Sequence, residues 1–214
     1  MKNKFIGFLG LVLLAALAAC SVSNKTYSTM LNDKDSAVIN TLFDDAPIYC
    51  LGRYTFNYPK ALTQELSSVI TIDDMTIESQ FLYPPAFKQR IELREQELKN
   101  ERVSDALNEP FLKEIVQLGD GIIFDSNQGF RVPDFGRILE GHVYIDNVAF
   151  IIKTEIRDVS NPKYKNMQIR DQKYSIPITD KPQKLAAMQS LISRLHGRPK
   201  NEIPTEKGIC IPYG

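Results

Sequence analysis

The first twenty residues limit the possible fold more than any other stretch of the chain. Lys2 and Lys4 form a short basic region, and residues 5–19 then run without a single charged side chain. That run is too short for a comfortable membrane span, which needs about 20 apolar residues. A basic start, a short apolar run and small residues at its end are typical of a secretory signal peptide. We therefore expect residues 1–19 to be removed on export, so that residues 20–214 build the fold.

The end of this leader, Leu17-Ala18-Ala19-Cys20, resembles the lipobox of bacterial lipoproteins. In that motif the cysteine thiol takes a diacylglyceryl group, the peptide is cut just before it, and the new amino group is acylated. Cys20 is therefore the candidate lipidation site, and its acyl chains would anchor firmly, because each buried CH₂ group contributes about 0.8 kcal/mol. Lipoproteins that are retained in the inner membrane have Asp directly after the lipidated cysteine, whereas this chain has Ser21. By this resemblance we expect a periplasmic protein anchored to the inner leaflet of the outer membrane. The alternatives are an ordinary signal peptide and an uncleaved anchor helix.

Two cysteines remain if Cys20 carries lipid. An exported chain meets an oxidising compartment, in which paired thiols persist as disulfides. Cys50 and Cys210 then allow a single intramolecular pairing. In the chain-entropy model, a disulfide that closes a loop longer than about 100 residues is worth about 5 kcal/mol. The alternative is a pair of buried free thiols, which behave as small hydrophobic side chains.

Composition and motifs exclude several classes of function. Without residues 1–19 the 26 basic and 26 acidic residues become 24 and 26, a net charge of −2, and no basic cluster indicates nucleic-acid binding. The chain has no nucleophile elbow, metal-binding spacing, phosphate loop or dinucleotide motif. His142 and His196 lie far apart, no neighbouring base could activate Cys50, and Glu92 with Glu95 indicates a solvated helix face. We therefore expect no enzyme activity, no cofactor and no metal.

The remaining pattern mixes strands and helices. Residues 20–46 are expected to form the lipid anchor and tether, with a short helix at 36–43. Several antiparallel strands in two blocks, each followed by an amphipathic helix, predict an α+β fold whose antiparallel sheet is covered on one face by these helices. The apolar face of the first strand is expected to point inward. Strands are predicted at 48–57, 69–72, 75–81, 122–125, 137–145, 148–157 and 167–178, helices at 86–103 and 182–196, and either state at 111–118.

Three segments together resemble a known family. They are CLGRYTFNYP at 50–59, FKQRIELREQELKN at 87–100 and RPKNEIPTEKGICI at 198–211. In order and spacing they are similar to the first strand, the first charged helix and the interdomain link of immunity proteins cognate to type VI secretion phospholipase effectors. The resemblance covers nearly all of the mature chain.

This resemblance implies a function and a domain division. Such proteins act in the periplasm, bind an incoming lipase-type effector, and block its active site or hold its lid without turnover of their own. Residues 47–198 would be the N-terminal α+β domain, and 199–214 the link to a second domain that this chain lacks. The motif positions indicate core and linker, so the exposed loops at 126–135 and 158–168 are the candidate contacts. The alternatives are a structural or assembly lipoprotein of the envelope and an unrecognised hydrolase.

Overall fold

The computed structural model describes residues 32–59, 61–62, 69–199, 202–205 and 207–213, so the leader and Cys20 lie outside the described residues. The chain divides into two units, one ending at Leu42 and one beginning at Phe43. Helix α2 (Asp33–Phe43), all but the last residue of which belongs to the first unit, confirms the predicted helix at 36–43 and buries none of its residues. Within the described ranges, no helix is long and apolar enough to cross a membrane.

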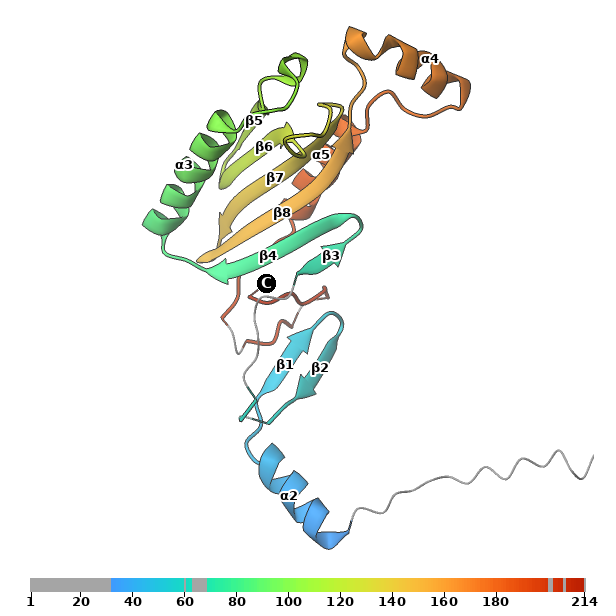
Figure 1. Cartoon of the computed structure of the whole chain (residues 1–214). Helices are drawn as coiled ribbons and strands as arrows, with labels where there is room; N and C mark the ends of the chain where they lie inside the picture. The colour runs from blue at the N-terminus through green and yellow to red at the C-terminus, as the bar shows by residue number, and fades with distance from the viewer. Residues whose placement is uncertain (1–31, 60, 63–68, 200–201, 206, 214) are drawn as a thin grey trace, which may run out of the picture. The chain divides into compact units, whose positions relative to one another are not determined.

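The second unit is built around a six-stranded antiparallel sheet (Figure 1). The strands follow one another across the sheet in the order β3-β4-β8-β7-β6-β5. The two longest strands, β7 and β8, pair along their whole length in its interior. An α+β fold with an antiparallel sheet is therefore confirmed. The strands are β3 (Ile70–Ile72), β4 (Met75–Phe81), β5 (Leu112–Leu118), β6 (Gly121–Asn127), β7 (Gly136–Ile145) and β8 (Val148–Arg157).

Turn chemistry explains the two tight hairpins. Between β7 and β8, Asp146 and Asn147 have φ angles of 51° and 67°. Positive φ at both central residues is the signature of the two-residue turn that matches the twist of the flanking strands. Asp73, between β3 and β4, also has a positive φ, of 53°. The four strands of these hairpins are among those that the sequence predicts, at 69–72, 75–81, 137–145 and 148–157.

Helices α3 (Pro84–Asn100) and α5 (Lys181–Ile192) pack on opposite faces of the sheet. On one face Leu98 of α3 packs against Ile122, and on the other Met188 of α5 belongs to the same cluster as Ile123. Ile122 and Ile123 are neighbours on β6, and neighbouring strand residues point to opposite faces. The structure thus differs from the expectation that the helices share one face, because β6 carries apolar side chains on both sides and each side needs a cover.

The stretch 48–57, predicted as one strand, is instead a separate hairpin of β1 (Ile48–Leu51) and β2 (Tyr54–Asn57). The chain reverses at Gly52, whose φ of 63° is accessible to glycine at little cost. The predicted inward face is wrong as well, because Tyr54 is 78% exposed and Phe56 is 45% exposed.

The predicted strand at 167–178 is also wrong, because this stretch holds helix α4 (Lys165–Lys173). The helix follows a short 3₁₀ turn, η2 (Pro162–Tyr164), in which the side-chain oxygen of Asn161 accepts a hydrogen bond from the Lys163 N–H. Asp171, the one buried residue of α4, forms an ion pair with Arg157 of β8. This contact spans fourteen positions of the chain and leaves no trace in the local pattern of apolar residues.

Candidate binding site at one end of the sheet

Three connections meet at one end of the sheet, near the top of Figure 1. One leads into the start of β5 and contains the 3₁₀ turn η1 (Ala106–Asn108), and a second, residues 128–135, joins β6 to β7. The third leaves the end of β8 and contains η2 and α4. Because neighbouring strands are antiparallel, the start of β5, the end of β6, the start of β7 and the end of β8 lie at the same end of the sheet. The candidate contact loops 126–135 and 158–168 therefore lie at the same end of the sheet.

Asp134 connects these three segments. Its carboxylate lies 2.8 Å from Lys163 Nζ and 3.4 Å from Lys113 Nζ, and it accepts a hydrogen bond from the Tyr164 hydroxyl. Lys163 Nζ also donates to Asn108 Oδ1 at 2.9 Å. Burial alone would raise the pKa of Asp134, but the bonds from Lys163 and Tyr164 and the charge of Lys113 hold it below its usual value. The end of the sheet is thus held by a charged network between segments far apart in sequence.

A second network ties this end to the sheet itself. Arg137 of β7 lies 3.0 Å from Asp125 Oδ1 through its Nε and 2.7 Å from Asp158 Oδ2 through Nη2. Lys181, at the start of α5, places Nζ 2.6 Å from Asp125 Oδ2. Burial raises the pKa of Asp125, and the two cations oppose that shift. A buried charge that loses its partner destabilises the fold. Each side chain of this cluster therefore holds the others in position.

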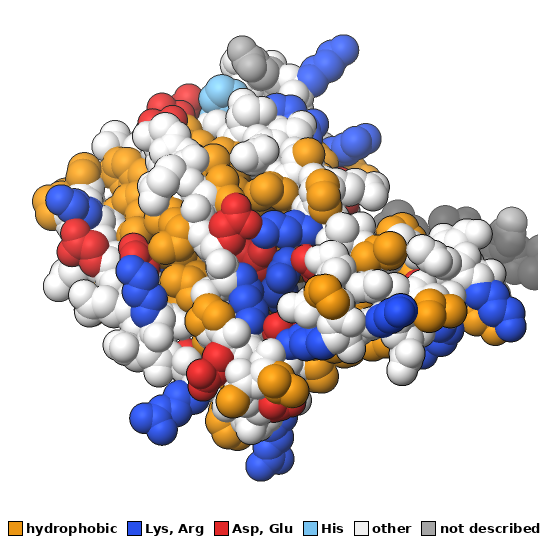
Figure 2. Space-filling view, turned by 90° about the horizontal axis from the view of Figure 1, so that it is seen from above, with side chains coloured by type: hydrophobic (Ala, Val, Ile, Leu, Met, Phe, Trp, Pro, Cys, Tyr) orange, Lys and Arg blue, Asp and Glu red, His pale blue; other side chains and the backbone are white. Residues whose placement is uncertain are grey.

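Several large apolar side chains stay exposed at this end of the sheet. Figure 2 looks down on it and shows hydrophobic side chains beside a central group of lysines, arginines and carboxylates. Large apolar groups that stay exposed on a well-fixed frame are typical of protein interaction surfaces, because they give contact area at low entropic cost on binding. They are Leu107 (75% exposed), Phe130 (50%), Ile169 (58%), Tyr174 (64%) and Ile176 (45%).

A shallow depression lies beside this end, between the last turns of α3 and Phe130. Leu93 and Phe130 supply its apolar part, and both are about half exposed. Glu97, Glu101 and Arg102 surround them. It is an open depression with charged walls, which suits a side chain of a protein partner better than an enclosed small molecule.

Buried polar groups of the sheet pair with one another and with α3. Glu140 accepts from Arg94 Nε at 2.9 Å, and its Oε1 lies 2.7 Å from Nε2 of the buried His142. Burial alone would raise the pKa of Glu140, but the bonds from His142 and Arg94 lower it to about 2. Arg94 reaches Glu140 from α3, so Arg94, Glu140 and His142 form one polar cluster on the sheet. In the ranges that the structure covers, no cluster of His, Cys, Asp or Glu could hold a metal ion.

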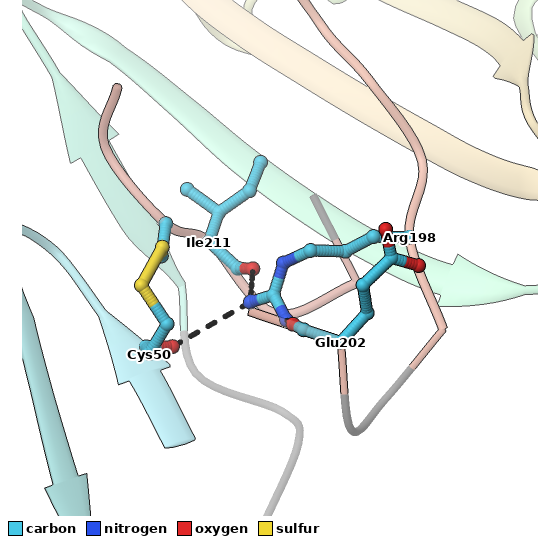
Figure 3. Close-up of a disulfide and its surroundings, with 5 residues drawn as sticks. Cys50, Arg198, Glu202 and Ile211 are labelled. Atoms are coloured by element: carbon cyan, nitrogen blue, oxygen red, sulfur yellow. Dashed lines mark hydrogen bonds between the residues drawn. A yellow bond between two sulfur atoms is a disulfide. The ribbon is translucent and has the colours of Figure 1, made fainter. Parts of the chain in front are cut away.

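Cys50 and Cys210 form a disulfide that joins β1 to the C-terminal segment, with Cα atoms 5.7 Å apart (Figure 3). Arg198 lies beside it and donates through Nη2 to the carbonyl oxygens of Ile211, at 3.0 Å, and Cys50, at 3.5 Å. Cys210 and Ile211 are both buried, and Ile211 packs into the core of the sheet domain. The disulfide is a structural link and lies away from the three connections at the end of the sheet, near the β1–β2 hairpin.

The sequence predicts the loops at this end of the sheet but not the contacts that connect them. The loops at 126–135 and 158–168 could be selected because they contain turn residues and lack apolar periodicity. Helix α4 was missed, and so were the charged networks around Asp134 and Asp125. The local sequence does not indicate which charged residues from distant segments will form ion pairs. The basic residues clustered between 163 and 173 are the one signal that marks this segment.

A protein family matches most of the described chain. A family described as Tle cognate immunity protein 4, N-terminal domain, matches residues 47–198. This range contains the β1–β2 hairpin, the whole sheet, both covering helices and α4. Comparison with curated protein sequences finds no match.

Two solved structures have a similar fold. One is the apo immunity protein TplEi of the T6SS from Pseudomonas aeruginosa, with a TM-score of 0.56 and 16% identity over 78% of this chain and 49% of that chain. The other is a chain of the Tle4–Tli4 complex, with a TM-score of 0.55 and 16% identity over 78% of this chain and 48% of that chain. At this identity the likeness shows the fold alone. The chain spans about half the length of these solved relatives.

Proposed function

The chain belongs to the family of Tle cognate immunity protein 4 N-terminal domains, and from this membership we propose that it is an immunity protein that binds and neutralises a type VI secreted phospholipase effector. The family match over residues 47–198 carries the proposal, because it spans the complete sheet domain. One of the solved proteins with this fold is described as a T6SS immunity protein, and the other comes from a Tle4–Tli4 complex. The protein acts as an inhibitor and catalyses no reaction of its own.

The matched part of this chain covers only about half of each solved relative. The proposal therefore assigns to residues 47–198 the contacts that an N-terminal domain makes with the effector. Residues 199–214 are proposed as the start of the link to a second domain.

The proposal also places the protein in the periplasm, anchored through lipid on Cys20 to the inner leaflet of the outer membrane. The lipobox-like end of the leader supports the anchor, and the Cys50–Cys210 disulfide suits an oxidising compartment. Tethering would raise the local concentration of the inhibitor at the membrane, where a phospholipase acts. Inhibition at the site of damage is the physical advantage of such an anchor.

Complex formation tests the inhibitory function. The full chain, extracted in detergent, is mixed at micromolar concentration with the phospholipase encoded by the neighbouring gene, and the mixture is separated by size exclusion. We expect one complex, and we expect cells that export the phospholipase to survive only when they also make this chain. Separate elution of the two proteins, together with unchanged cell death, would refute the function.

Lipidation is tested independently. Cells fed radiolabelled palmitate should label the wild-type chain and leave the Cys20→Ser variant unlabelled. The variant should also leave the outer-membrane fraction. Equal labelling of the two proteins would show that Cys20 is not the lipid attachment site, while the effector-binding result would stand unaffected.

A further inference from the structure

Helix α4 has one face that the fold of the described chain does not explain. Lys165, Ile169 and Lys173 are spaced four residues apart, so they lie on the same side of the helix. Asp171, the buried residue, lies on the opposite side. Ile169 is 58% exposed although it is aliphatic and sits in the middle of the helix. The side of α4 that faces solvent therefore places one isoleucine between two lysines.

The position of α4 is set by polar contacts and not by core packing. Asp171 pairs with Arg157, and Gln168 Nε2 donates to the carbonyl oxygens of Val159, at 2.6 Å, and Asn161, at 3.1 Å. An isolated helix of nine residues is marginal in water, so α4 depends on these bonds. Desolvation makes a buried ion pair a weak source of net stability, and so the core gains little from this helix. What these bonds do achieve is to hold the exposed face of α4 in one orientation.

The exposed face has a definite chemistry. Tyr174 follows directly after the helix, is 64% exposed, and lies with its ring centroid 5.6 Å from Lys173 Nζ. Arg170 adds another exposed cation, 3.6 Å from Asp171, and the charge of the buried Asp171 is also opposed by its half-buried partner Arg157. In Figure 1, α4 stands out from the sheet at the upper right, and on that side of Figure 2 lysine and arginine side chains lie beside hydrophobic ones.

We propose that the α4 face, formed by Lys165, Ile169, Lys173 and Tyr174, docks into an apolar hollow with an acidic rim on the effector protein. This inference rests on the proposed function and assigns the surface through which that function is carried out. Ile169 and the Tyr174 ring would fill the hollow, since buried aliphatic and aromatic anchors contribute most of the energy of protein interfaces. The lysines would meet the acidic rim, where complementary charge raises the association rate and selects the partner.

The same face suits a lipid bilayer less well. Helices that lie in a bilayer surface bury a broad apolar face between their basic residues. Here Asn166 and Gln172 occupy the positions beside the lysines, and Ile169 is the one aliphatic side chain of the stripe. A single isoleucine gives too little area to insert among acyl chains, but it is enough to fill a pocket on a protein.

Charge-matched variants test this proposal. The probe is a catalytically inactive form of the phospholipase encoded by the neighbouring gene, titrated with the full chain in detergent. We expect Ile169→Asp to weaken the affinity by about tenfold or more, and K165E/K173E to lower the association rate and its dependence on salt. The control R53E/K88E changes the charge equally on exposed positions away from α4, and it should bind within about twofold of wild type.

Each outcome has one meaning. If wild type does not bind the phospholipase, the proposed function fails and this inference fails with it. If wild type binds and both α4 variants bind equally well, the function stands and the docking surface is wrong. Thermal unfolding of each variant should match wild type, because the Arg157–Asp171 pair is untouched, and the neutral pair K165Q/K173Q replaces any variant that melts early.

A vesicle arm separates the membrane from the protein partner. The full chain carrying Cys20→Ser is sedimented with vesicles of phosphatidylethanolamine and phosphatidylglycerol, with and without K165E/K173E. We expect the two proteins to sediment equally. A fall in vesicle binding with unchanged affinity for the phospholipase would overturn the proposal in favour of a lipid-binding face.

Discussion

Removal of the Cys50–Cys210 disulfide should free the β1–β2 hairpin while leaving the six-stranded sheet folded. The two cysteines are 160 residues apart, and the chain-entropy model gives about 5 kcal/mol for a loop of that length. Apart from the disulfide, Gly52 and Cys210 exchange two backbone hydrogen bonds of 2.8 and 2.7 Å. Two such bonds contribute together about 1–3 kcal/mol.

That contribution is too small to keep the hairpin in place. Ordering about ten residues costs about 1–2 kcal/mol for each backbone unit, and an isolated two-stranded hairpin is marginal in water. The exposure of Tyr54 and Phe56 shows that β2 adds little apolar burial to offset this cost. The Cys50→Ser variant should therefore lose stability mainly through local detachment of the hairpin. The free energy of unfolding of the sheet itself should fall by less than the about 5 kcal/mol that the entropy model gives.

Hydrogen exchange followed by mass spectrometry distinguishes local from global loss. In Cys50→Ser, peptides that contain Gly52 and Cys210 should lose protection, while peptides from β7 and β8 keep theirs. Reduction of the wild-type protein should have the same effect, and Cys20→Ser should have none. If the Gly52 amide keeps its wild-type protection after reduction, contacts other than the disulfide hold the hairpin and this reasoning is wrong.

Three further perturbations test the polar contacts and the close packing of the sheet. The folded pKa of Glu140, about 2, lies below its ordinary value of 4.5, so ionised Glu140 stabilises the folded state. This stabilisation, about 3 kcal/mol, should be present above about pH 4.5 and be lost as the pH falls towards 2. Urea unfolding across that range should show this loss in wild type and a flatter profile in Glu140→Gln. Asp171→Asn should release α4 from Arg157, and trypsin should then cut the basic residues of α4 faster than in wild type while the melting temperature of the sheet changes little. Gly121→Ala would place a Cβ atom 2.0 Å from the backbone oxygen of His142, so thermal unfolding should show a loss of about 1–3 kcal/mol, and an unchanged melting temperature would contradict the register of β6 and β7.

The elements that the sequence predicts correctly are those with strong local signals. The two-residue turn Asp146-Asn147 between β-rich arms indicates a hairpin by itself, because residues that tolerate positive φ are needed there. The stripe Phe87, Ile91, Arg94 and Leu98 likewise predicts the face of α3 that packs on the sheet. In both cases the residues that decide the structure are close together in the chain.

The two stretches whose secondary structure the sequence predicts wrongly have the opposite character. Residues 48–57 alternate like a strand, but one glycine with positive φ reverses the chain in the middle. Residues 167–178 also contain spaced apolar side chains, yet α4 buries only Asp171. That helix is stabilised by contacts with Arg157 and with backbone oxygens elsewhere, which periodicity cannot reveal.

By itself the sequence predicted a leader with a candidate lipidation site at Cys20, and it determined the α+β class and the two tight hairpins of the six-stranded sheet. These features depend on residue type and local spacing, as does the family resemblance of the three segments. Only the tertiary structure decided which helix covers which face of the sheet, and that Asp134, Lys113 and Lys163 meet at one end of it. It also decided that α4 projects from that end with Ile169 exposed. The physical reason is that these features depend on long-range strand pairing and on the burial of charges drawn from separate segments, and neither leaves a periodic signal in a single stretch of chain.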